Sequence, residues 1–145
     1  METFLSSGMI ELSTRLLVAL GLGTLIGLER VLAHKTAGMR TYGLVSMGSA
    51  LFVIISELVN TDGDPLRVAS QIVVGVGFLG AGLIIFKDSH LQGLTTASAL
   101  WVAAGIGMAA GFGLFELAVV VSLFTLFTFT VLWYAETLVK RWWEK

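Results

Sequence analysis

The feature that most constrains this chain is an apolar run from Leu94 to Tyr134, which contains a single charged residue, Glu116. As one helix it would be about 60 Å long, roughly twice the thickness of the hydrocarbon layer of a bilayer. The run must therefore fold back, and Gly111-Phe112-Gly113 is the natural break. It predicts two membrane-crossing helices, at about 95–112 and 114–134.

The rest of the chain has the composition of a membrane protein. Hydrophobic residues make up 56% of the 145 residues and charged residues only 13%, against about 25% charged in soluble domains. Three further apolar runs predict spans at about 12–28, 42–59 and 67–86. We therefore predict an all-α, polytopic membrane bundle of five transmembrane helices, forming a single domain over residues 1–145.

The basic residues predict how this bundle is oriented. If the five spans alternate in direction, one side holds only Arg15 and Arg67, and Glu11 lies four residues before Arg15, the spacing of a helical ion pair. We expect Arg15 to be an anchor at the lipid headgroups. The other side holds Arg30, Lys35, Arg40, Lys87, Lys140, Arg141 and Lys145. Because cytoplasmic loops are rich in Lys and Arg, the N-terminus is expected outside and the C-terminus in the cytoplasm.

Several function classes are disfavoured by the composition. There is no cysteine, so no disulfide, thiol nucleophile or zinc-thiolate site exists. The net charge of −1 and the lack of a basic tract before the tail disfavour a nucleic-acid partner. His34 and His90 are isolated, which predicts no metal site. No catalytic constellation appears within one helical face, so we expect neither an enzyme nor a cofactor.

Glycine, with 17 residues, is prominent in the apolar runs. Two G-x-x-x-G patterns, Gly23 with Gly27 and Gly107 with Gly111, allow helix backbones to meet inside the bundle or in a homodimer. We predict a homodimer because five short helices bury little surface among themselves. The run 67–86 is expected to be the central helix, with neighbours on two glycine faces. Its packing glycines are Gly75, Gly77, Gly80 and Gly82, three of which form a G-x-G-x-x-G pattern that, inside an apolar run, indicates packing and not nucleotide binding.

Polar residues at the ends of the spans are the candidates for function. Asp64, Arg67 and Gln71 follow each other at spacings of three and four on one helix face. We expect Gln71 to turn inward, either as an interhelical hydrogen-bonding group or as part of a functional polar site. A magnesium pathway would place carboxylates at membrane depth, whereas the carboxylates here lie at span ends, in loops or in the tails. This distribution disfavours a self-contained magnesium carrier.

Four segments resemble the N-terminal membrane domain of the MgtC/SapB family. They are GTLIGLER at 23–30, AGMRT at 37–41, DPLRVASQIVVGVGFLGAG at 64–82 and GLTTASALWVAAGIGMAAG at 93–111. The resemblance implies a multi-pass protein of the bacterial inner (plasma) membrane. The MgtC branch is associated with growth at low magnesium, survival inside host cells and restraint of the F-type ATP synthase. MgtC proteins proper also carry a soluble C-terminal domain, and we expect this chain to be a short, SapB-like member that lacks it.

The resemblance also marks ten candidate site residues, expected to converge between helices at the cytoplasmic end and in the outer third. They are Glu29, Arg30, Arg40, Thr41, Asp64, Arg67, Gln71, Thr95, Thr96 and Trp101. The expected function is modulation of magnesium-linked ion homeostasis, through a polar intramembrane site or a membrane-protein partner. The alternatives are a small channel or transporter for an ion or small solute, and an assembly module without a site.

Overall fold

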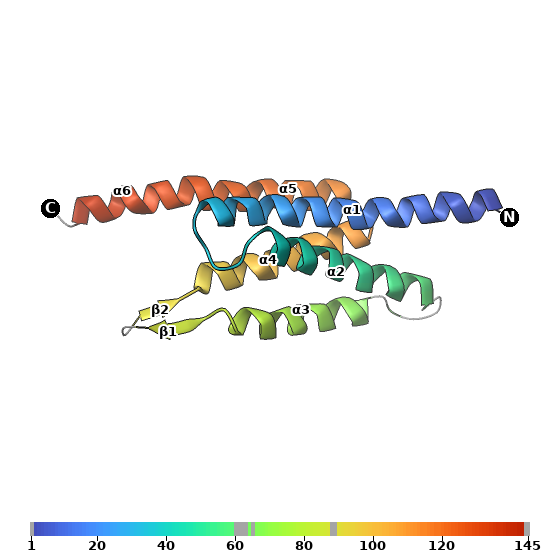
Figure 1. The fold of residues 1–145 in the computed structure, drawn as a ribbon, viewed down its shortest axis with the longest axis horizontal. Helices are drawn as coiled ribbons and strands as arrows, with labels where there is room; N and C mark the ends of the chain where they lie inside the picture. Colours follow the sequence, from blue (N-terminus) through green and yellow to red (C-terminus); the bar gives the residue numbers. More distant parts are fainter. Residues whose placement is uncertain (1, 60–63, 65, 88–89, 144–145) are drawn as a thin grey trace.

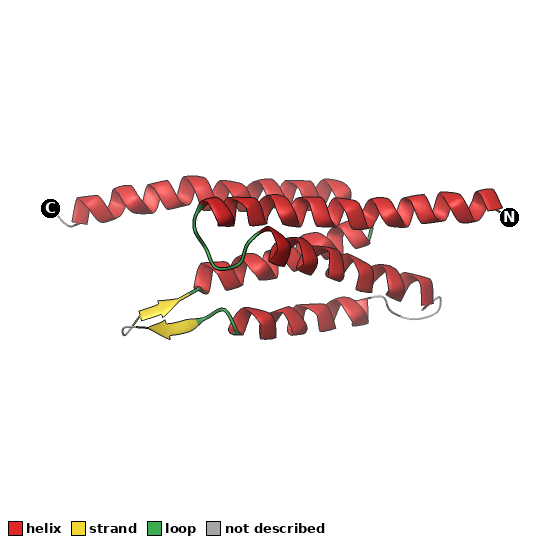
Figure 2. Cartoon of the chain, viewed as in Figure 1, coloured by secondary structure: helices red, strands yellow, loops and turns green. Residues whose placement is uncertain are grey.

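The computed structural model describes residues 2–59, 64, 66–87 and 90–143. The helices are α1 (Glu2–Leu32), α2 (Met39–Val59), α3 (Leu66–Ala81), α4 (Leu94–Gly111), α5 (Phe115–Phe127), the π-helical segment η1 (Thr128–Leu132) and α6 (Trp133–Trp143). The strands β1 (Ile85–Lys87) and β2 (His90–Gln92) form one antiparallel hairpin. Figures 1 and 2 show the helices as an elongated bundle with the hairpin at one end.

The helix at the centre of the bundle is α4. It contacts α1, α2, α3 and α5, while α2 packs on both α1 and α4. Its buried residues are mostly small, with Ala103, Ala104 and Ala110 almost inaccessible to solvent, which lets neighbouring helices approach from several sides. The expectation that the run 67–86 forms the central helix is therefore wrong: α3 lies at the edge of the bundle, opposite α1 and α5 (Figure 1).

The predicted all-α membrane class is confirmed at the level of helix length and composition. Among the described residues, four helical segments are long and apolar enough to cross a membrane: Gly8–Leu32, Met39–Val59, Leu94–Gly111 and Phe115–Trp143. The fifth apolar helix, Leu66–Ala81, has 16 residues and a length of about 24 Å, short of the hydrocarbon thickness of about 30 Å.

The ends of the elements differ from the prediction in three places. The first helix begins at Glu2 instead of about residue 12, and the last continues through η1 to Trp143 instead of ending at about 134. The predicted third span of 67–86 ends as a helix at Ala81, and the strands Ile85–Lys87 and His90–Gln92 follow it. Most of the segment between the second and third predicted spans lies outside the described residues, as does Lys145.

Gly93 is the residue that allows the chain to pass from the hairpin into α4. It has φ of 90°, and a Cβ there would lie 2.1 Å from the carbonyl oxygen of Leu83. A side chain is excluded by both the left-handed backbone and the close contact. The apolar pattern alone did not predict strands at this point, because each strand has only three residues.

The two G-x-x-x-G patterns lie where α1 and α4 meet α2. A Cβ on Gly107 would lie 2.0 Å from the carbonyl oxygen of Ser46, and one on Gly27 would lie 2.5 Å from Cα of Met39. A similar Cβ at Gly23 would lie 2.6 Å from the Tyr42 carbonyl oxygen, and Gly111 is also in close contact with α2. These four glycines thus lie at backbone-to-backbone contacts within the chain.

The glycines of α3 behave differently. A Cβ on Gly75 or Gly77 would meet nothing within 4 Å, and one on Gly80 would make ordinary contact with Ala97 at 3.6 Å. Gly82 lies in the turn after α3. The expectation that neighbours approach α3 closely on two glycine faces is therefore wrong within a single chain, because α3 is an edge helix.

Candidate functional site

Arg30, near the end of α1, is the most deeply buried charged side chain among the described residues, with 4% of its surface exposed. Its guanidinium forms an ion pair and a hydrogen bond with the carboxylate of Glu29, which is 19% exposed. The guanidinium also lies over the ring of Phe129, whose centroid is 3.4 Å from the guanidinium carbon. An ion pair and an aromatic face together offset the several kcal/mol that burying a cation costs.

Tyr42 on α2 and Thr96 on α4 extend the site beyond this charge pair. Tyr42 is fully buried, its electrostatic environment includes Arg30 and Glu29, and its hydroxyl donates to the carbonyl oxygen of Thr96 at 3.2 Å. Thr96 is itself 5% exposed. We refer to Glu29, Arg30, Tyr42, Thr96 and Phe129 as the Arg30 cluster. It draws on α1, α2, α4 and η1, and so connects most of the bundle.

Phe129 belongs to η1, where the helix winds with i→i+5 hydrogen bonds. Its side chain is the buried one of that segment, at 8% exposure, while its neighbours Thr128 and Thr130 are exposed. Short π segments are frequent at functional sites, where they redirect a side chain. Here the segment carries the ring that covers the Arg30 guanidinium.

The ten candidates from the sequence do not all converge. The structure brings Glu29, Arg30 and Thr96 together in the Arg30 cluster. The other seven candidates are exposed within the chain: Arg40, Thr41, Asp64, Arg67, Gln71, Thr95 and Trp101. Asp64 acts as a helix cap, since its Oδ1 accepts a hydrogen bond from the Leu66 N–H at 2.9 Å.

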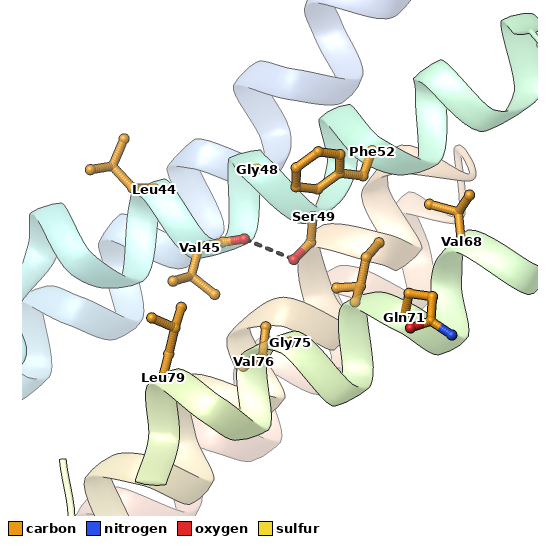
Figure 3. A pocket seen from close by; sticks show the side chains of 11 residues that line it. Leu44, Val45, Gly48, Ser49, Phe52, Val68, Gln71, Gly75, Val76 and Leu79 are labelled. Carbon is orange, nitrogen blue, oxygen red and sulfur yellow. Dashed lines mark hydrogen bonds between the residues drawn. The ribbon is translucent and has the colours of Figure 1, made fainter. Parts of the chain in front are cut away.

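Gln71 lines an open groove between α2 and α3 with a volume of about 480 Å³. Figure 3 shows it near Val68, with Phe52 and Ser49 across the groove on α2. The Ser49 hydroxyl donates to the Val45 carbonyl oxygen at 2.8 Å. The expectation that Gln71 turns inward is wrong for the single chain, because α3 is an edge helix. Apart from Gln71 and Ser49, the groove is lined by apolar side chains and glycine.

Arg15, near the middle of α1, forms a second polar cluster. Its guanidinium donates to Glu11 at 2.6 Å, to Glu57 at 2.7 Å and to the carbonyl oxygen of Gly111 at 2.9 Å. The predicted Glu11–Arg15 pair is confirmed. The side chain is only 16% exposed, so Arg15 is not a simple headgroup anchor: it joins α1 to α2 and to the C-terminal end of α4, where a cation complements the helix dipole.

Two members of the Arg30 cluster, Tyr42 and Phe129, were not among the sequence candidates. Tyr42 could have been found, because a tyrosine at the start of an apolar span next to Arg40 and Thr41 has a hydroxyl that needs a partner once buried. Phe129 is one of nine phenylalanines, and nothing in the sequence distinguishes it. Among the described residues, no three His, Asp or Glu side chains are grouped so that they could hold a metal ion.

Comparison with known proteins places the chain in a family. The MgtC family matches residues 16–138. Protein MgtC of Brucella abortus (strain 2308) is 50% identical over 103 residues, which cover 71% of this chain and 43% of that protein. The putative magnesium transporter YhiD of Escherichia coli K12 is 44% identical over 124 residues, covering 80% of this chain and 57% of YhiD.

A third relative, protein MgtC of Salmonella typhimurium (strain 14028s), is 45% identical over 111 residues, covering 77% of this chain and 48% of that protein. The chain thus spans about half the length of these curated relatives. No solved structure matches it. Because the family match covers most of the chain, including every residue of the Arg30 cluster, this membrane protein belongs to the MgtC family.

Proposed function

We propose that this protein modulates magnesium-linked ion homeostasis in the bacterial inner membrane, through the Arg30 cluster or a membrane-protein partner, without catalysing a reaction or carrying the ion itself. Membership of the MgtC family supports the link to magnesium, as does the name of one relative, putative magnesium transporter. The observation that carries the proposal is the burial of the Glu29–Arg30 pair among α1, α2, α4 and η1.

The chemistry of the polar groups favours a modulator over a carrier. A magnesium ion that loses water needs oxygen ligands, usually including carboxylates. The Glu29 carboxylate is engaged by Arg30, whose positive charge repels a second cation nearby. The groove between α2 and α3 offers only Gln71 and Ser49 as polar side chains. Neither place provides the ligands that a dehydrated magnesium ion requires.

We also propose five spans, with the N-terminus outside and the C-terminus in the cytoplasm. Figure 1 supports this arrangement, because the loop after α1, the hairpin and the end of α6 lie at the same end of the bundle. That end gathers most of the cations: Arg30, Lys35, Arg40, Lys87, Lys140 and Arg141. An excess of Lys and Arg marks the cytoplasmic side.

The proposed function predicts a growth defect without ion flux. A strain lacking its own MgtC-family protein should grow poorly in magnesium-limited medium and recover when this chain is expressed. The purified protein in liposomes should move no magnesium, potassium, protons or anions. A flux of magnesium or another ion above that of empty liposomes would contradict the proposed modulator and favour the channel or transporter alternative. Normal growth of the deletion strain under every cation limitation would contradict both the modulator and the channel or transporter alternative.

We further propose that a second copy packs against α3, forming a homodimer. The proposal is supported by Gly75 and Gly77. A Cβ at either position would meet no atom of this chain within 4 Å, so the backbone of a second copy can approach them. Cysteines at the exposed Val74 and Phe78 should crosslink between copies in native membranes, and Gly75→Leu should reduce the crosslinked fraction. A cysteine at exposed Phe124 on α5 is the matched control. Crosslinking that is absent, or equal at Phe124, would contradict the dimer.

A further inference from the structure

The hairpin has two chemically different faces. In the antiparallel register Phe86 pairs with Leu91, while Ile85 pairs with Gln92 and Lys87 with His90. Side chains of directly paired residues share a face, and successive residues alternate. One face therefore carries Phe86 and Leu91, which are 71% and 58% exposed. The other carries Lys87, Gln92 and His90 together with Ile85.

A hairpin of this size needs support from its surroundings. Two strands of three residues each form the whole sheet, and an isolated two-stranded hairpin is at best marginally stable in water. No residue of either strand is buried within the chain. The hairpin also cannot lie in the hydrocarbon core, because each unsatisfied backbone group along its strand edges would cost several kcal/mol there. The boundary between hydrocarbon and water satisfies both requirements.

The length of α3 places the hairpin at this boundary. The helix spans about 24 Å, and the extended residues from Ile84 to Phe86 add roughly 10 Å. If α3 starts at the outer edge of the hydrocarbon, Phe86 lies beyond a core of about 30 Å but within the 40–45 Å of the whole bilayer. This step rests on the five-span orientation of the proposed function.

From this geometry we infer that the hairpin is a membrane-interface anchor on the cytoplasmic leaflet. Phe86 and Leu91 enter the boundary between headgroups and acyl chains, and the face with Lys87 lies toward the phosphates. Anionic lipid is the matching occupant, because basic residues near a membrane surface are attracted to it. At the same end of the bundle, α6 presents Trp142 and Trp143, which are 86% and 88% exposed, beside Lys140 and Arg141 (Figure 1). Tryptophans and cations of this kind are typical of a membrane interface.

Single cysteines test the inference directly, because the natural chain contains none. Phe86→Cys and Leu91→Cys report the apolar face, and Gln92→Cys is the matched control on the opposite face. Each full-length variant is spin-labelled in liposomes of phosphatidylethanolamine and phosphatidylglycerol. Accessibility to oxygen, which concentrates in lipid, is compared with accessibility to a water-soluble nickel chelate.

The ratio of oxygen to nickel accessibility should be several-fold higher at positions 86 and 91 than at 92. Replacing phosphatidylglycerol by phosphatidylcholine, or adding Lys87→Gln, should reduce this difference. High and equal accessibility to the nickel chelate at the three positions would overturn the anchor, because it would place both faces of the hairpin in water. Shielding of positions 86 and 91 from both reagents would overturn it by showing that protein covers that face. Labelling of Gln92→Cys by an impermeant reagent from outside the cell would instead contradict the proposed orientation.

Discussion

Replacing Arg30 by methionine should destabilise the folded protein by about 3–5 kcal/mol, the usual cost of breaking a buried ion pair by removing one partner. The guanidinium is 4% exposed, so its loss leaves the Glu29 carboxylate without a cation in a site that is largely shielded from water. The contact with the Phe129 ring is lost as well. The measurement is the free energy of unfolding of the purified protein in detergent micelles or bicelles.

Two further variants separate the charge pair from general damage. Arg67→Met removes an arginine that is exposed on α3 and should change the unfolding free energy by no more than about 0.5 kcal/mol. The double variant Glu29→Gln/Arg30→Met should recover much of the lost stability, because no unpaired charge remains. If Arg30→Met proves as mild as Arg67→Met, the Arg30 cluster does not hold the bundle together.

Adding one methyl group at Gly107 should have an effect of similar size. A Cβ at this position would lie 2.0 Å from the Ser46 carbonyl oxygen, on the backbone of α2. Backbone cannot move aside like a flexible side chain, so α2 and α4 must separate. Overpacking of this kind costs about 1–3 kcal/mol and sometimes more. We therefore expect Gly107→Ala to lower the free energy of unfolding by about 3 kcal/mol.

Gly105→Ala, on the same helix α4, is the matched control for this prediction. It makes the same chemical change on an apolar helix, but its Cβ would meet nothing within 4 Å. Stability should be unchanged or slightly raised, because alanine favours the helix over glycine by up to about 1 kcal/mol. Equal losses of stability from Gly107→Ala and Gly105→Ala would mean that the close contact between α2 and α4 does not determine the loss.

Much of the fold follows from patterns that the sequence displays. The apolar runs and the break at Gly111-Phe112-Gly113 predict where helices lie and where the chain reverses, because membrane spans need long apolar segments. The spacing of Glu11 and Arg15 predicts their ion pair correctly. The two G-x-x-x-G patterns point to positions that the structure places in close contact with α2. Each of these signals is local in the chain.

The errors arise where the outcome depends on how helices are arranged. Glycines indicate that a helix can be approached closely, but they do not say whether a neighbour is present. The predictions of a central helix at 67–86 and of an inward Gln71 fail for this reason. The aromatic partner of Arg30, Phe129, lies about one hundred positions later in the chain, in a π segment that no sequence signal predicts. The hairpin after α3 depends on pairing between two very short strands.

The most direct test of the account is whether the buried charges are needed for function once the fold is intact. Glu29→Gln/Arg30→Met is expressed in the deletion strain under magnesium limitation, and its amount and folding in the membrane are compared with those of the natural chain. We expect normal amounts of folded protein that fail to restore growth. Growth restored to the level of the natural chain would show that the Glu29–Arg30 pair is not the functional part of this protein.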